Sequence, residues 1–311
     1  MTGAAPVSAA PDQMPRLRFG ERAAEGIAAV ALAGPAFLLL FALVLLPCAA
    51  VFIVALTDWQ LGARTLHFVG LDNFVELLSD PVFRRSFGNT LVFAGGVVPA
   101  TLGAGLLVAL LIEAGNSARA VYRAIHFLPF MATLAAMAVV WEALLHPTIG
   151  LVNQILQALG LPTANWLRDE DTALAALAVI SVWQNLGLAM VLFLAGLKAI
   201  PPDLYDAADI DGADEPIDRF TTVTLPMLGP VGLFVLVIVA LRVIETFDTV
   251  RILTEGGPAH ASELLLHTLY VESFDFLRTG YGAAMAVVFL AIVTALTLLQ
   301  AQLLDRRMHY Q

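Results

Sequence analysis

The chain has 311 residues, of which 59% are hydrophobic and only 14% charged, and its mean hydropathy is +0.83. Soluble domains carry about 25% charged residues, so this composition excludes an ordinary soluble protein and indicates that lipid surrounds most of the chain. No basic patch interleaved with aromatic residues points to nucleic acid, and the single cysteine, Cys48, excludes an internal disulfide.

A polar tail precedes the first apolar segment. Residues 1–25 are mostly small or polar and include three arginines. The charge-free run that follows covers residues 26–57, which is much longer than the core of about 7 to 15 residues in a cleavable signal peptide. We therefore predict a cytoplasmic tail over 1–25, a retained membrane anchor, and one membrane domain over 26–311.

Six charge-free windows are long enough to cross a bilayer, which takes about 20 apolar residues. They predict an all-α polytopic fold with six transmembrane helices and membrane lipid as a partner. A further window, 143–167, is interrupted by prolines and glycines, and we expect it to hold only a short interfacial helix near 151–159. The six predicted spans are 26–57, 86–112, 124–141, 172–197, 220–241 and 279–304.

The distribution of basic residues predicts the orientation. With the N-terminus inside, nine Lys and Arg residues fall on the inner side and six on the outer side. Cytoplasmic loops of membrane proteins carry an excess of Lys and Arg, so both termini are predicted to be cytoplasmic. Acidic residues contribute little to this rule, so an acidic loop can still lie inside despite the net charge of −10.

Known catalytic motifs are missing from the sequence. Lys198 is the only lysine and is not part of a phosphate-binding loop, which excludes a Walker-type ATP site. Glu142 and His146 are one helical turn apart but lack a third ligand, so we predict no metal and no cofactor. The glycines of "GAGLLV" at Gly103 are better explained by close helix contact than by dinucleotide binding. We therefore predict that the chain is not an enzyme.

Polar side chains inside the spans are costly and therefore mark candidate functional positions. Gln184 and Asn185 lie near the middle of the fourth span, and Arg242, Glu245 and Thr246 lie toward the outer end of the fifth. The alternative is that they only hold helices together, with Arg242 pairing with Glu245 one turn away. The neighbouring aromatic residues, Trp183 and Phe247, are suited to stacking on a ligand or to packing.

The loop between the fourth and fifth spans, about residues 201–222, is strongly acidic, with seven carboxylates in residues 203–218. Asp203 is a suitable N-cap for a short helix, and Asp206 is placed to complete a capping box. Gly212 supplies the left-handed residue that ends such a helix.

The first helix of this loop presents small side chains on one face. The first helix is followed by a second short helix, which starts at Asp214 and Pro216 and leads into the fifth span. The loop is either an acidic connector or a docking surface, and two capped helices with a small face favour docking. The face consists of Leu204, Ala207, Ala208 and Asp211, and Phe220 and Pro226 lead into the span.

The loop resembles a known family. "YDAADIDGA" followed by "FTTVTLP" is similar to the Glu-Ala-Ala loop of the permease subunits of binding-protein-dependent ABC importers, with Asp206 in place of the first Glu and one extra residue before Phe220. Three other segments resemble the sugar importers of that family. They are "FVGLDNFVELLSDPVFRRSFGNTLVF" (68–93), "GLVNQIL" (150–156) and "FDTVRILTEGGPAHASELLLHTLYVESF" (247–274), whose "LTEGGP" is typical of the first of two permease types, as in maltose, glycerol-phosphate and trehalose importers.

The resemblance implies a type I, maltose-permease-like architecture and a place in a larger complex of the bacterial inner membrane. The partners would be a second, different permease, two ATP-binding subunits that hydrolyse ATP, and an extracytoplasmic solute-binding protein. The cargo would be a carbohydrate or polyol derivative, and Gln184, Asn185, Arg242, Glu245 and Thr246 would line its path.

The resemblance also implies a role for each loop residue in coupling to the ATPase. Asp206 would face a basic group of the ATPase, Ala207 and Ala208 with Asp211 would form the contact face, and Gly212 would make the turn. Phe220 and Pro226 would link the loop to the fifth span. The alternative is a non-transporting scaffold or receptor subunit that docks a cytoplasmic partner. A secondary transporter is disfavoured because the two halves show no repeat and the spans hold no acid pair for ion coupling.

Overall fold

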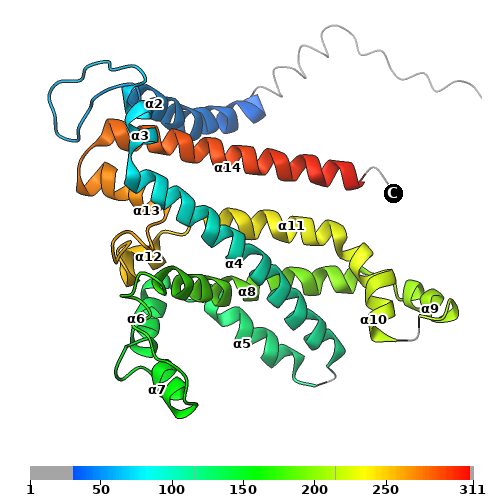
Figure 1. The fold of residues 1–311 in the computed structure, drawn as a ribbon. Coiled ribbons are helices and arrows are strands. Elements are labelled where there is room, and N and C mark those ends of the chain that lie inside the picture. The colour runs from blue at the N-terminus through cyan, green and yellow to red at the C-terminus, as the bar shows by residue number, and fades with distance from the viewer. Residues whose placement is uncertain (1–30, 116, 214, 309–311) are drawn as a thin grey trace, which may run out of the picture. The chain divides into compact units, whose positions relative to one another are not determined.

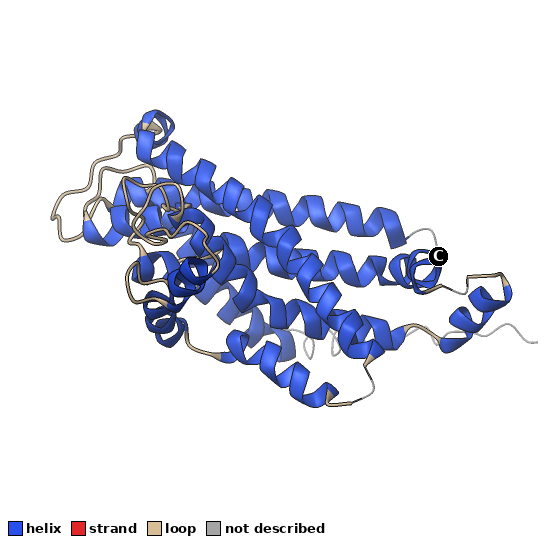
Figure 2. Cartoon of the chain, turned by 60° about the horizontal axis from the view of Figure 1, so that its bottom comes forward, coloured by secondary structure: helices blue, strands red, loops and turns tan. Residues whose placement is uncertain are grey.

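The computed structural model describes residues 31–308 except 116 and 214, so the predicted tail over 1–25 lies outside the described residues. The described part of the chain is helical, with one isolated antiparallel bridge between Thr57 and Phe68 and no strand (Figure 2). Backbone contacts divide the chain into two units, Met1–Val51 and Phe52–Gln311.

The first unit contains most of an apolar helix, Ala31–Val54. One turn of it is π-helical (η1, Phe41–Leu45), and α2 (Leu46–Val54) completes it. None of its side chains is buried within the chain, and Leu43, for example, is 70% exposed. A helix of this length with an apolar surface on all sides suits a lipid environment, as predicted for the first span.

The second unit is built from long helices joined by shorter ones (Figure 1). In chain order these are α3 (Asp72–Ser79), α4 (Pro81–Ala114), α5 (Arg119–Met131), α6 (Leu134–Leu144), α7 (Leu151–Ala158), α8 (Ala173–Ala199), α9 (Pro202–Ile210), α10 (Pro216–Arg219), η2 (Phe220–Thr224), α11 (Leu225–Ile244), α12 (Asp248–Leu253), α13 (Leu265–Tyr270), η3 (Val271–Asp275) and α14 (Thr279–Met308).

Five helices of the described residues are long and apolar enough to span a membrane, and a sixth span results if the bent pair α5 and α6 counts as one. The predicted third span, 124–141, is therefore not a continuous helix, because the chain bends by 103° between the two. Pro129 removes a backbone donor near the end of α5, and Ala132 and Thr133 are extended. The short helix expected near 151–159 is present as α7.

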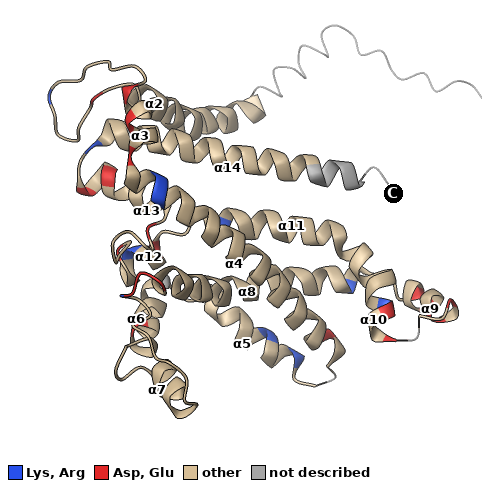
Figure 3. Ribbon diagram, viewed as in Figure 1, with Lys and Arg blue, Asp and Glu red and all other residues tan. Residues whose placement is uncertain are grey.

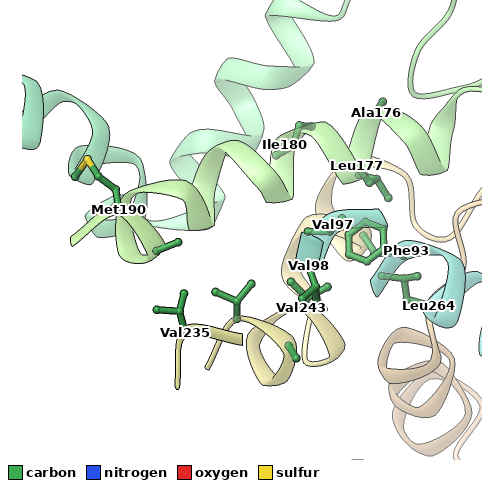
Figure 4. Close-up of a cluster of buried hydrophobic side chains, with 14 of the residues drawn as sticks. Phe93, Val97, Val98, Ala176, Leu177, Ile180, Met190, Val235, Val243 and Leu264 are labelled. Atoms are coloured by element: carbon green, nitrogen blue, oxygen red, sulfur yellow. The ribbon is translucent and has the colours of Figure 1, made fainter. Parts of the chain in front are cut away.

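The core of the second unit lies where α4, α8 and α11 meet (Figure 4). Phe93 and Val97 of α4, Leu177 of α8 and Val235 of α11 are almost completely buried there. The helices approach closely at glycines, because a Cβ at Gly105 would lie 2.6 Å from the Cβ of Ala189. The predicted role of the "GAGLLV" glycines in helix contact therefore holds at Gly105, whereas Gly103 has open space around its Cα.

Candidate functional site

A cavity of about 330 Å³ opens between α5, α8, α11 and the start of α12. All five polar residues that the sequence placed on a substrate path line this one cavity. They come from two helices and the turn that follows the second. The lining residues are Phe130, Ser181, Gln184, Asn185, Arg242, Glu245, Thr246, Phe247, Asp248 and Thr249.

The cavity lies at the depth expected of a site inside a membrane. Asn185 lies 12 residues after the first residue of α8, Ala173, and 14 before the last, Ala199. At 1.5 Å per residue these separations are about 18 Å and 21 Å. The polar wall is therefore near the middle of a helix that is long enough to span the bilayer.

The amide residues of α8 do not join helices to one another. Asn185 is buried and donates from Nδ2 to the carbonyl oxygen of Ser181 at 2.9 Å, within its own helix. Among the described residues, Gln184 makes no side-chain hydrogen bond within the chain. Polar residues in spans often form hydrogen bonds between helices, but within the described part of this chain these two side chains form none.

The ion pair between Arg242 and Glu245, which was the alternative to a role in transport, is not formed in the described part of the chain. The backbone N–H of Glu245 still donates to the carbonyl oxygen of Leu241 at 3.0 Å, so the end of α11 is not what keeps the two side chains apart. Within the described residues, Arg242 makes no salt bridge and lies 4.7 Å from the centre of the Phe130 ring. The guanidinium is thus held at the cavity wall by an aromatic face.

The two aromatic residues proposed for ligand stacking have different surroundings. Phe247 lines the cavity and packs against Tyr270, with ring centres 4.9 Å apart. Trp183 is not among the residues of this cavity and meets Trp141 edge to face at 5.4 Å. Only Phe247 is therefore placed to contact a ligand, and Trp183 has a packing role.

Behind Phe247 lies a buried polar cluster that the sequence pattern did not reveal. Glu263 accepts from Thr268 at 3.0 Å and lies 2.6 Å from Nδ1 of His267, whose ring is 6.0 Å from that of Phe247. Asn89 of α4 donates to the carbonyl oxygen of Glu263 at 3.0 Å. The spacing of Glu263 and His267, one helical turn apart in an apolar stretch, was the available signal.

Charged residues gather at the two ends of the second unit and are sparse along the long helices between them (Figure 3). We call these the α9 end and the α12 end after the helices that lie there. At the α12 end Arg278 contacts Glu76, lies 3.1 Å from Glu272 and covers the Tyr281 ring at 4.2 Å. Burial raises the pKa of Glu272 above its usual range, against the opposing effect of Arg278.

The acidic loop forms the α9 end as helix, glycine turn and helix. Gly212 has φ +89°, the left-handed conformation expected of it, with open space around its Cα. The predicted capping by Asp203 is wrong, because α9 begins at Pro202 with Pro201 in the cap position and without a side-chain cap. Proline at the first helical position has no backbone N–H to satisfy, and the N–H of Leu204 donates to the carbonyl oxygen of Pro201 at 3.2 Å instead of to a side-chain cap. The predicted start of the second helix at Asp214 lies outside the described residues.

Three contacts join α9 to the fifth span. The hydroxyl groups of Tyr205 and Thr224 are 3.0 Å apart, and Arg219 pairs with Asp209 at 2.8 Å. Ala208 is buried in a small apolar cluster. Helix α9 is therefore attached to the π-helical turn η2 and to the start of α11 rather than suspended on a connector. The cluster around Ala208 consists of Ile200, Val223 and Leu228, with Leu106, Leu197, Tyr205, Ala213 and Val231 beside it.

These contacts divide the predicted coupling residues into two sets. Asp206, Ala207 and Asp211 are exposed and available to a partner. Ala208 is only 9% exposed and faces its own chain, so its predicted place on the partner-facing surface is corrected. The periodicity that grouped it with Ala207 does not tell which side of a helix faces the rest of the chain. Phe220 begins η2 and Pro226 lies in the first turn of α11, as expected for a link to the span.

Comparison with known proteins identifies the family. Residues 101–310 match the binding-protein-dependent transport system inner membrane component family. The chain belongs to this family. It is an inner-membrane permease component of an ABC importer, and the predicted resemblance to sugar-importer permeases is confirmed. As a permease, it is a transporter component.

Two curated relatives of this permease are 34% identical to it. The probable ABC transporter permease protein YurN of Bacillus subtilis aligns over 251 residues, which cover 79% of this chain and 86% of YurN. The sn-glycerol-3-phosphate transport system permease protein UgpA of Yersinia enterocolitica aligns over 248 residues, which cover 79% of this chain and 83% of UgpA.

A solved structure shares the fold of the permease. A chain of the bacterial alginate ABC transporter, crystallised with an alginate pentasaccharide-bound periplasmic protein, superposes with a TM-score of 0.81 at 21% identity. The match covers 93% of this chain and 98% of that chain. This likeness confirms the predicted ABC importer permease fold.

Proposed function

We propose that this permease forms, with a second and different permease, the translocation path for a carbohydrate or polyol derivative. The observation that carries the proposal is the convergence of Gln184, Asn185, Arg242, Glu245 and Thr246 on one cavity about halfway along α8. Their amide, guanidinium, carboxylate and hydroxyl groups both donate and accept hydrogen bonds, which suits a ligand rich in hydroxyl groups. The names of the relatives support this class, since one transports sn-glycerol-3-phosphate and another belongs to an alginate importer.

Coupling to ATP hydrolysis occurs at the α9 end in this proposal. Asp206, Ala207 and Asp211 contact one of two separate ATP-binding subunits, and the attachments of α9 to α10 and η2 carry its displacement to α11. Because Arg242 lies in the last turn of α11, movement of that helix reaches the cavity wall directly. The permease itself carries no cofactor. Helices that are packed and bonded to one another move as rigid units, so a displacement at one end of the helices reaches the other end.

The remaining parts of the proposal concern placement in the membrane. Both termini and the α9 end face the cytoplasm, and the α12 end faces the extracytoplasmic solute-binding protein. The excess of basic residues on the inner side supports this orientation.

The test is ATP hydrolysis by the complete complex in lipid nanodiscs, with and without binding protein loaded with sugar. A transporter predicts that loaded binding protein stimulates hydrolysis several-fold. A scaffold or receptor subunit that only docks a cytoplasmic partner predicts no stimulation, and that result would contradict the proposal. Asp206→Lys should remove the stimulation, because it reverses a charge on the exposed side of α9, and reversing the facing charge of the ATPase should restore part of it.

A further inference from the structure

We propose that the ligand of this cavity is uncharged or positively charged, and that Glu245 and Asp248 select against phosphorylated and carboxylated sugars. The inference rests on the proposed function and goes beyond it by assigning the charge of the cargo. It depends on which ionisable side chains this chain contributes to the cavity wall.

The lining holds one cation and two anions. Arg242 supplies +1, and Glu245 and Asp248 supply −1 each, so the sum for this chain is −1. The other seven lining residues are apolar or neutral and polar. Asp248 was not among the path residues that the sequence indicated, and it lines the cavity as the first residue of α12, which begins directly after the turn that follows α11. A site built for a phosphate or carboxylate would instead carry an excess of Arg or Lys.

The positive charge has an aromatic partner within the chain. The Arg242 guanidinium lies over the Phe130 ring at 4.7 Å, so one face of the group is covered. Among the described residues, neither Glu245 nor Asp248 makes a salt bridge. The two carboxylates therefore remain acceptors for hydroxyl or ammonium donors of a ligand.

Electrostatics make this balance selective. A cavity between helices screens charge less than bulk water does, so a net negative wall repels an anionic ligand more strongly than a flat solvated surface would. A neutral sugar can donate hydroxyl groups to the carboxylates and accept from Arg242, Gln184 and Asn185. An amino sugar gains attraction in addition. Selection by an unfavourable charge is a usual way to reject one of two similar ligands.

The first arm of the experiment measures the charge of the cavity without a ligand. Thr246→Cys in a Cys48→Ser background, in the complete complex, is treated with a cationic and an anionic methanethiosulfonate reagent. The measured quantity is the rate of cysteine modification by the cationic reagent divided by the rate with the anionic reagent. This ratio should be about tenfold higher at Thr246→Cys than for free cysteine in solution. Neutralising both carboxylates with Glu245→Gln and Asp248→Asn should shift that ratio toward the anionic reagent by about tenfold or more, since the lining changes from −1 to +1.

A matched control removes two carboxylates outside the cavity. Glu170→Gln with Asp171→Asn changes exposed residues of the loop before α8 and should leave the ratio unchanged. A wild-type ratio that favours the anionic reagent would overturn the inference. So would a double variant at Glu245 and Asp248 that leaves the ratio as it is in the wild type.

The second arm measures uptake into proteoliposomes that contain the complete complex and its binding protein. The probes are glycerol, glucose and maltose, the cation glucosamine, and the anions glycerol-3-phosphate, glucose-6-phosphate and glucuronate. One or more neutral or cationic probes should enter at least about tenfold faster than any anion. Faster uptake of an anion overturns the charge inference and leaves the proposed function intact. If none of the probes is taken up although the first arm shows that the cavity favours the cationic reagent, the proposed function is contradicted. The charge of the cavity then gives no basis for assigning the charge of a cargo.

Discussion

Two buried asparagines show how residues of the same type serve different ends in this permease. Asn153 donates from Nδ2 to the carbonyl oxygens of Pro147 and Ala164, at 2.9 and 2.8 Å, and accepts from Nε1 of Trp166 at 2.8 Å. It fastens α7 to the segment before α8. Within the described residues, Asn185 donates only to Ser181, one turn earlier in its own helix, and lines the cavity. Burial alone therefore does not separate a structural amide from a candidate ligand contact.

This difference predicts opposite effects of the same substitution. Asn185→Leu should lower uptake by about tenfold, because losing a buried hydrogen bond to a ligand costs about 1 to 3 kcal/mol, while complex yield and melting temperature stay near those of the wild type. Asn153→Leu should lower the melting temperature, since it leaves the Trp166 indole donor and two carbonyl groups without their partner. Uptake, thermal stability and ATP hydrolysis of both purified complexes provide the comparison.

The result that would contradict this assignment is parallel loss of stability and uptake in Asn185→Leu. In that case the side chain holds the helix bundle together, and the cavity wall has no special role in transport. Loss of uptake with stability and ATP hydrolysis retained supports a translocation site.

At the scale of elements, α9 moves with the fifth span only if its attachments hold. Tyr205→Phe with Asp209→Asn removes the hydroxyl contact to Thr224 and the ion pair with Arg219. The amount of sugar taken up per ATP hydrolysed should fall, by about fivefold if each of the two contacts contributes roughly 0.5 kcal/mol to coupling. The complex should still assemble, because Asp206 and Ala207 on the exposed side of α9 are unchanged.

Thr221→Val is the matched control for this prediction. Its hydroxyl donates to the carbonyl oxygen of Asp218 at 3.2 Å, so the bond stays within the same short segment and does not reach α9. The control should keep the wild-type ratio of uptake to ATP hydrolysed. If the double variant also keeps that ratio, these contacts do not transmit the displacement.

The elements differ in how far the sequence determines them. Hydropathy located the spans because length and lack of charge are properties of a single segment. It did not show the bend after α5, since residues 124–141 are free of charge on both sides of the extended Ala132 and Thr133. It also could not show that Ala208 faces its own chain, because helical periodicity groups residues by face without saying which neighbour a face meets.

The candidate site was predictable for a different reason. Polar groups within a span are costly, so Gln184, Asn185, Arg242, Glu245 and Thr246 were conspicuous one at a time. Their convergence on one cavity depends on how α8 and α11 pack, which no local pattern contains. Asp248 was missed because it follows a helix end, where polar residues are ordinary. Glu263 and His267 were missed because their signal, a spacing of one helical turn in an apolar stretch, is weak.

At the scale of the whole molecule, the charge-rich α9 and α12 ends of the permease, which the proposal assigns to the ATPase and to the binding protein, are joined by the same helices (Figure 3). Helix α8 connects the cavity to α9, and α11 connects it to η2 (Figure 1). The polar wall described here belongs to one chain, and the second permease is proposed to complete the path. An importer needs these ends on opposite sides of the membrane, because ATP is inside and the binding protein is outside.

Cysteine accessibility tests that orientation. In a Cys48→Ser background, cysteine at Ile217 of α10 should be shielded from a membrane-impermeant thiol reagent in intact cells and should react after permeabilisation. Cysteine at Thr163, in the loop between α7 and α8, should react in intact cells. Both positions are exposed in the structure, so burial does not limit either reaction. The reverse labelling pattern would show that the α9 end lies outside.

The measurement that tests the central claim most directly is uptake of sugar by proteoliposomes that hold the complete complex in one orientation. ATP is sealed inside with the ATPase subunits, and loaded binding protein is added outside. The account predicts that sugar accumulates only when both are present, and that Asp206→Lys, at the α9 end, abolishes accumulation. Accumulation without ATP, accumulation driven by an ion gradient, or normal uptake by Asp206→Lys would contradict it.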